Sequence, residues 1–172
     1  MIYEPKEDSY LLQKFVKKYA LGRVLDMGAG SGIQARTALQ RTRDVLAVDI
    51  NPEAVEHCKE QGIPALQSDL FDKVEGKFDV IIFNPPYLPR DEREDKESSL
   101  ITTGGKKGSE VLERFMNNAG LYLADEGKIL TVVSSLTPDA EKIITRNGFR
   151  FTILGKQSAA FEQLVVYLIE RG

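Results

Sequence analysis

Asp26-Met27-Gly28-Ala29-Gly30-Ser31-Gly32 is the stretch that decides the fold of this chain. It joins a short apolar run, Arg23–Met27, to a segment with helical periodicity, Gly32–Gln40. Glycines at a strand-to-helix turn let the backbone bend tightly and let a ligand approach it closely. The stretch therefore predicts a nucleotide-like cofactor at this turn. A glycine-rich turn without a ligand is the alternative.

Strand and helix patterns alternate on both sides of the turn, which predicts a parallel sheet with helices on both faces. Predicted strands lie at Val45–Ile50, 63–67, Phe78–Phe83 and Ile129–Ser134, and predicted helices at about 7–20, 52–61, 109–123 and Pro138–Asn147. Two further strands are expected near 149–154 and 162–169. The segment between them, Gly155–Ala160, is too short for a helical crossover, so these strands should pair antiparallel.

Composition narrows the class of protein. A chain of 172 residues with 42% hydrophobic content suits one domain spanning 1–172. Its net charge of -3 argues against direct DNA binding, although a local basic patch remains possible. Cys58, the only cysteine, adjoins His57 on a predicted helix, and such neighbours do not share a face, so no metal site is expected. With neither a signal peptide nor a membrane-length apolar run, we expect a cytoplasmic protein without membrane contact.

The glycine spacing excludes a dinucleotide fingerprint, because a G-x-G-x-x-G pattern starting at Gly28 would need glycine where Ile33 stands. The pattern present is D-x-G-x-G-x-G. In addition, Asp49 ends the second predicted strand, where a carboxylate can accept hydrogen bonds from both hydroxyls of a ribose. Together these features favour a ribose-containing cofactor over an empty turn.

Asn84-Pro85-Pro86-Tyr87 directly follows the buried strand Phe78–Phe83. Two prolines could simply end a strand, but that does not explain the asparagine and the aromatic residue beside them. The carboxyl end of a parallel strand is where ligands bind in such sheets. The segment is therefore the second candidate part of a site.

Both segments resemble motifs of one enzyme class. D-x-G-x-G-x-G resembles the first motif of class I methyltransferases, and Asn84–Tyr87 resembles the N-P-P-Y motif of amino and amide N-methyltransferases. The resemblance implies a seven-stranded sheet in the order 3-2-1-4-5-7-6 with strand 7 antiparallel. It also implies the cofactor S-adenosyl-L-methionine. The cofactor-binding residues it implies are Ser9, Asp26, Gly28, Gly30, Asp49, Asp69, Leu70 and Asn84.

The resemblance implies a role for several of these residues. Asp26 would lie beside the cationic amino group of the methionine moiety, a charge that needs a partner. Asp69 would accept the adenine amino hydrogen, although an Asp capping a turn is the alternative. Leu70 would pack on the adenine ring.

The implied catalytic residues are Asn84, Pro85, Pro86 and Tyr87. A planar nitrogen is a poor nucleophile because its lone pair is delocalised. The Asn84 side-chain oxygen and the Pro85 carbonyl can accept hydrogen bonds from the two hydrogens of this nitrogen. Tyr87 can pack on the planar group that carries it. Orientation and electrostatics can then carry much of the catalysis.

The opening segment narrows the resemblance further. Tyr3–Ser9 resembles the Y-E-P-A-E-D-T opening of archaeal and eukaryotic HemK-like release-factor glutamine methyltransferases, and Gly104–Gly108 resembles a glycine-basic segment of the same proteins. The implied substrate is the glutamine of the Gly-Gly-Gln loop in a peptide-chain release factor. Methylation of adenine in DNA or of an RNA base is the alternative, and a non-catalytic scaffold that binds the cofactor is a weaker one.

The resemblance also implies a partner. Relatives work with a small zinc-binding activator protein, and the short strand near Ile63–Gln67 should lie at the sheet edge, where Pro64 is tolerated. An open edge flanked by Ile63, Ala65 and Leu66 invites strand addition. A self-sufficient monomer is the alternative.

Overall fold

A computed structural model describes residues 1–86 and 108–172 of the chain. Tyr87 and most of the glycine-basic segment Gly104–Gly108 lie outside these residues. The strands are β1 Val24–Met27, β2 Val45–Asp49, β3 Ala65–Gln67, β4 Phe78–Phe83, β5 Leu123–Ser134, β6 Phe149–Ala159 and β7 Glu162–Arg171. The helices are α1 Glu7–Tyr19, α2 Ile33–Leu39, α3 Pro52–Glu60, α5 Glu110–Tyr122 and α6 Ala140–Arg146.

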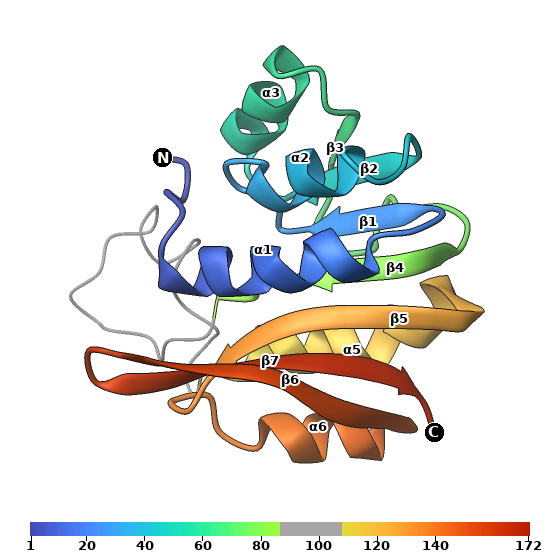
Figure 1. Cartoon of the computed structure of the whole chain (residues 1–172). Helices are drawn as coiled ribbons and strands as arrows, with labels where there is room; N and C mark the ends of the chain where they lie inside the picture. The colour runs from blue at the N-terminus through green and yellow to red at the C-terminus, as the bar shows by residue number, and fades with distance from the viewer. Residues whose placement is uncertain (87–107) are drawn as a thin grey trace.

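The strands form a seven-stranded sheet in the order β3-β2-β1-β4-β5-β7-β6. The pairs from β3 to β5 are parallel, whereas β7 runs antiparallel to both β5 and β6 (Figure 1). This confirms the predicted class I methyltransferase topology. The carboxyl ends of β1, β2 and β4 therefore meet at one edge of the sheet.

Two hydrophobic cores lie on opposite faces of the sheet, because successive strand residues point to opposite sides. Leu25 and Met27 face α5 and α6, whereas Val24 faces α1 and α2. In Figure 1, α1 crosses the front of the sheet and α5 lies behind β5 and β7. None of the helices in the described ranges has the length and apolarity that crossing a membrane requires.

Local chemistry explains why α3 begins and ends where it does. The Asn51 side chain accepts a hydrogen bond from the Glu53 backbone N–H, and Pro52 occupies the first helical position. Both residues are favoured there. Gly62 follows the helix with φ +76°, a conformation that glycine adopts without strain. The predicted start and end of this helix are confirmed.

The last hairpin differs from the prediction. Gly155–Ala160 was expected to be a connecting loop, but β6 continues through it to Ala159, with a shift of strand register between Ile153 and Gly155. A Cβ atom at Gly155 would lie 2.9 Å from Cζ of Phe15. The glycine is therefore present because α1 packs closely on β6, and it does not end the strand.

The start of β5 also differs from the prediction. The strand begins at Leu123, directly after α5, and not at Ile129. Asp125 and Glu126 in its first half are exposed. These charged residues hide the apolar pattern by which a strand is recognised in a sequence.

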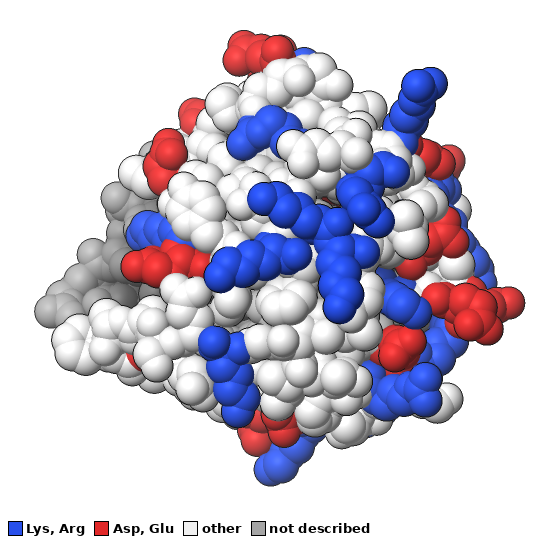
Figure 2. All heavy atoms as spheres, in the orientation of Figure 1, with Lys and Arg blue, Asp and Glu red and all other residues white. Residues whose placement is uncertain are grey.

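Lysine and arginine side chains gather on the outer side of α1 and just beyond α2 (Figure 2). The exposed residues are Lys14, Lys17, Lys18, Arg41 and Arg43, and they are called the basic face below. Lys14 lies three positions before Lys17 and four before Lys18, so it neighbours both lysines on the surface of the helix. A chain of net charge -3 thus carries a locally positive surface.

Candidate functional site

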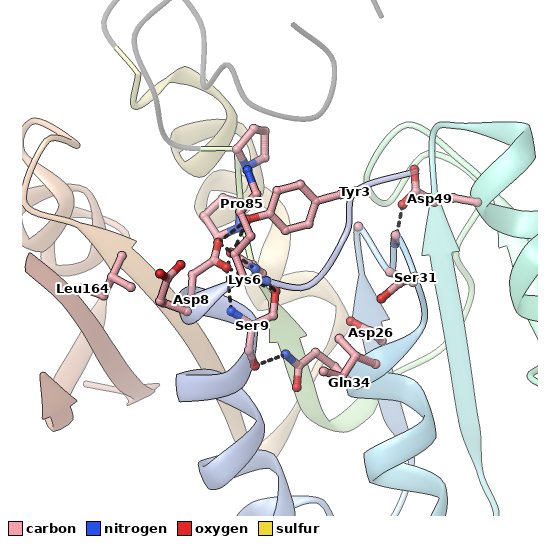
Figure 3. A pocket seen from close by; sticks show the side chains of 18 of the residues that line it. Tyr3, Lys6, Asp8, Ser9, Asp26, Ser31, Gln34, Asp49, Pro85 and Leu164 are labelled. Carbon is pink, nitrogen blue, oxygen red and sulfur yellow. Dashed lines mark hydrogen bonds between the residues drawn. The ribbon is translucent and has the colours of Figure 1, made fainter. Parts of the chain in front are cut away.

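A cavity of about 250 Å³ opens over the carboxyl ends of β1, β2 and β4 (Figure 3). In open α/β sheets this is the position where ligands bind. The predicted site residues that line it are Ser9, Asp26, Gly28, Gly30, Asp49, Asn84, Pro85 and Pro86. Both predicted segments, the glycine turn and the start of Asn84–Tyr87, therefore contribute to one cavity.

The glycine turn forms the floor between β1 and β2. Gly28 and Gly30 have φ values of +69° and +52°, a left-handed conformation that side chains disfavour. The backbone N–H groups of Gly28 and Ala29 donate to the Val48 carbonyl at 2.7 and 3.0 Å. These bonds fix the turn against β2. Because the glycines have no side chains, the backbone itself lines the cavity here.

Asp49 stands at the end of β2 beside this turn. Its Oδ2 accepts from the Gly30 N–H at 2.8 Å and its Oδ1 accepts from the Asn51 N–H at 2.9 Å. Burial raises the pKa of Asp49, and these backbone hydrogen bonds counter that shift in part. The carboxylate is thus held rigidly at the cavity wall, where the ribose of a cofactor is expected.

Asp26 lies deeper, with only 2% of its surface exposed. Its Oδ2 accepts from the Ala35 N–H at 2.9 Å. Burial raises the pKa of Asp26 to about 7, and the charge of Asp49 adds to the rise while the Ala35 N–H opposes it. A buried carboxyl in this state is suited to a cationic ligand group, because a positive charge would stabilise its ionised form. The cavity residues therefore fit the amino group of S-adenosyl-L-methionine.

Asn84, Pro85 and Pro86 continue from β4 into the cavity wall. Asn84 is half-buried and Pro85 is buried. The Asn84 amide donates from Nδ2 to Oδ2 of Asp8 at 3.3 Å. Tyr87 lies outside the described residues, so its role stays a prediction.

Asp69 and Leu70 are not among the described residues that line this cavity. Oδ2 of Asp69 accepts from Arg114 at 3.0 Å. Leu70 has a left-handed φ of 48°, and its carbonyl accepts from the Ser68 hydroxyl at 2.9 Å. Their roles beside the adenine stay predictions.

Several cavity residues were not predicted from the sequence. Tyr3 and Asp8 line the cavity and belong to the opening segment Tyr3–Ser9, in which the resemblance implies a role for Ser9 alone. Gln34 donates from Nε2 to the Ser9 carbonyl at 2.9 Å and so joins α2 to α1.

The hairpin between β6 and β7 also reaches the cavity, through Ala159, Glu162 and Leu164. No sequence pattern indicated this contact, because it depends on how the last hairpin folds back over the sheet. Phe161 at the tip of the same hairpin is 96% exposed.

A sheet of this order with its cavity over β1, β2 and β4 defines a class I methyltransferase, and S-adenosyl-L-methionine is the cofactor of such an enzyme. The chain belongs to the methyltransferase small domain family, whose model matches residues 7–161.

Similar proteins carry more specific names. A Methanocaldococcus jannaschii protein whose name assigns it as a protein N5-glutamine methyltransferase is 40% identical over 176 residues, which cover 96% of this chain and 89% of the relative. The mouse methyltransferase HEMK2 is 29% identical over 187 residues, 96% of this chain and 87% of the relative. A solved structure of the E. cuniculi Mtq2–Trm112 complex, described as responsible for methylation of the termination factor eRF1, matches with a TM-score of 0.82 at 26% identity and covers 99% of both chains.

Proposed function

We propose that this chain, acting as a single domain over residues 1–172, methylates the side-chain amide of a glutamine in the Gly-Gly-Gln loop of a peptide-chain release factor. The observation that carries the proposal is the position of Asn84, Pro85 and Pro86 in the same cavity wall as Asp26 and Asp49. Relatives named as a protein N5-glutamine methyltransferase and as a release factor glutamine methyltransferase support a glutamine of a release factor as the substrate. With a release factor as the substrate, we expect the reaction to take place in the cytoplasm.

The proposed roles divide between holding the cofactor and holding the substrate. Asp26 faces the cationic amino group and Asp49 the ribose. When bound, S-adenosyl-L-methionine supplies an activated methyl group. The Asn84 Oδ1 and the Pro85 carbonyl accept the two hydrogens of the glutamine amide and orient its nitrogen toward that methyl group. The prolines donate no hydrogen bond that would compete for these acceptors.

Labelled S-adenosyl-L-methionine tests the substrate directly. We expect mass spectrometry to find one added methyl group on the Gly-Gly-Gln glutamine of a release factor, and none when that glutamine is replaced by alanine. Efficient labelling of adenine in DNA or of an RNA base, with none on the release factor, would show that the nucleic-acid alternative is right.

Removing the acceptor at Asn84 tests the catalytic role. Asn84→Ala should lower kcat at least tenfold, because one substrate hydrogen loses its partner, while the Kd for S-adenosyl-L-methionine changes little. Full activity of this variant on a verified substrate would contradict the role.

The same proposal includes an activator partner that binds by strand addition at β3, and we expect that partner to bind zinc. The structural neighbour in a two-protein complex supports the partner. β3 is an edge strand of three residues. However, Ile63 is buried and Leu66 is half-buried, so side chains at these positions present less open surface than the sequence alone suggested.

Backbone groups are therefore the better target for testing the partner. The Pro64 carbonyl and the Ser68 N–H bond to β2, so alternation along the strand turns the backbone of Ala65 and Gln67 toward the open edge. Gln67→Pro removes one outward N–H and should abolish the complex on gel filtration. Gln67→Ala keeps that N–H and should bind normally. Equal binding by both variants, or no complex with the wild type, would contradict strand addition.

A further inference from the structure

Asp8, near the start of α1, is a buried carboxylate that touches Asn84 across the cavity wall. Only 2% of its surface is exposed. Its Oδ1 accepts from the Ser9 N–H at 2.6 Å, and its Oδ2 accepts from the Tyr3 hydroxyl at 2.9 Å and from Asn84 Nδ2 at 3.3 Å. These donors come from three segments, and they hold the carboxylate in one place.

The chemistry of Asp8 determines which way the Asn84 amide faces. The two ends of a carboxamide have nearly the same shape but opposite hydrogen-bonding character. An ionised carboxylate only accepts hydrogen bonds, so the end of Asn84 that faces Asp8 must be the NH2 group. The carbonyl oxygen, Oδ1, then faces away from Asp8 and is available to a substrate.

A flipped Asn84 would fail in the proposed reaction. Its NH2 group would then face the NH2 group of the substrate glutamine. Two hydrogen-bond donors would meet, and one hydrogen of the glutamine amide would have no acceptor. In the same flip, Oδ1 of Asn84 would face the Asp8 carboxylate. Both contacts disfavour the flipped state, so Asp8 selects the reactive orientation.

We propose that Asp8 is a positioning residue that fixes the orientation of the Asn84 amide, and that the Tyr3 hydroxyl in turn holds Asp8 in place. The inference rests on the proposed function, since it assigns the Asn84 oxygen to the substrate amide. It adds a part of the site that the N-P-P-Y motif does not contain, because Asp8 lies 76 positions away from Asn84 in the chain.

Kinetics provide the first test. Asp8→Ala should lower kcat on the release factor at least tenfold and leave the Kd for S-adenosyl-L-methionine within about threefold, because the Asn84 oxygen that Asp8 orients is assigned to the substrate amide. Tyr3→Phe keeps the contact between Asp8 and Asn84 and should cause a smaller loss. Glu4→Ala is the matched control. Glu4 is exposed in the same segment, and its replacement by alanine removes the same charge as Asp8→Ala. Its kcat should equal that of the wild type.

A double-mutant cycle separates positioning from general destabilisation. In an Asn84→Ala background, Asp8→Ala should lower kcat less than twofold further, because the group that Asp8 orients is already gone. A structural role would cost the same factor in both backgrounds. A tenfold loss in each would overturn the inference.

Nuclear magnetic resonance of the side-chain amides gives a readout that needs no substrate. The Asn84 Nδ2 protons, identified by their loss in Asn84→Ala, should shift in Asp8→Ala and keep their wild-type positions in Glu4→Ala. Unchanged resonances in Asp8→Ala, or shifted resonances with full kcat, would overturn the inference. If Asp8→Ala does not fold, Asp8→Asn takes its place, because its amide preserves the shape but not the acceptor-only character.

The two proposals can fail separately. If the release factor is not methylated but the Asn84 resonances shift in Asp8→Ala, the substrate is wrong and the orienting contact stands. The kcat comparison is then made on the substrate that labelling identifies, and an unchanged kcat there overturns the positioning role.

Discussion

Asp26 makes the stability of the cofactor-free protein depend on pH. Its pKa of about 7 in the fold lies above its ordinary value of 3.8. Between these values the unfolded chain releases the proton more readily, so it binds fewer protons than the folded chain. The free energy of unfolding therefore falls as the pH rises from about 4 to 7, by roughly 4 kcal/mol at most. Chemical denaturation across this range should show the decline.

Asp26→Asn is the matched variant for that measurement. The asparagine keeps an oxygen for the Ala35 N–H but cannot ionise. The difference in unfolding free energy between wild type and variant isolates the Asp26 contribution from all other titrating groups. Parallel pH profiles for the two proteins would show that Asp26 titrates normally.

Asp49 should contribute to cofactor affinity. Asp49→Ala removes an acceptor for the ribose hydroxyls, and each charged hydrogen bond lost costs about 1.5–3 kcal/mol. Calorimetry should therefore record at least a tenfold weaker Kd for S-adenosyl-L-methionine. Equal affinity of the two proteins, or tighter binding of NAD, would contradict the assignment.

Apart from Ser9, which came from the resemblance of the opening segment, the predicted cavity residues lie at or just after the end of a strand. Asp49 and Asn84 each come at or just after the carboxyl end of a parallel strand, so neighbouring residues in the chain locate them. Gln34 and Asp8 escaped prediction because their cavity contacts join segments that are 25 and 76 positions apart. Such pairs become neighbours only when α1 packs against the sheet.

At the scale of single elements, Gly155 should be intolerant of any side chain. An added Cβ would press on the Phe15 ring at 2.9 Å, between α1 and β6. Gly155→Ala should lower the free energy of unfolding by about 1–3 kcal/mol, the usual cost of overpacking. Gly120→Ala is the control, since a Cβ there meets its nearest neighbour at 3.7 Å. A helical alanine at that position should be neutral or stabilising.

Thermal or chemical unfolding of Gly155→Ala and Gly120→Ala measures this difference in stability. Equal stability of Gly155→Ala and the wild type would mean that Phe15 moves aside without cost. The same contact explains why the sequence prediction failed here. A glycine that permits close packing and a glycine that ends a strand look identical in a sequence, whereas the capping residues of α3 have a purely local cause and were predicted correctly.

At the scale of the whole molecule, the order of the strands was predictable because it follows from the alternation of elements and a final short connection. The distribution of charge was not. The net charge of -3 left a local basic patch possible but could not locate it. In the fold, the exposed lysines of α1 lie beside the end of α2 (Figure 2). The net charge is the sum over the whole surface, whereas only the charge of one face acts when the protein contacts a partner or a matrix.

The basic face should govern how the protein behaves on an ion-exchange column. With a pI near 5.4, the chain ought to pass through a sulfonated resin at pH 7. We expect it to be retained there nevertheless, because it can turn its positive side to the matrix. Lys14→Glu combined with Lys17→Glu should abolish retention. Lys59→Glu combined with Lys73→Glu changes the net charge equally at two exposed lysines outside the five residues of the basic face, and it should largely preserve retention. Such retention would let a cation exchanger at neutral pH separate this acidic protein from acidic proteins that lack a basic face.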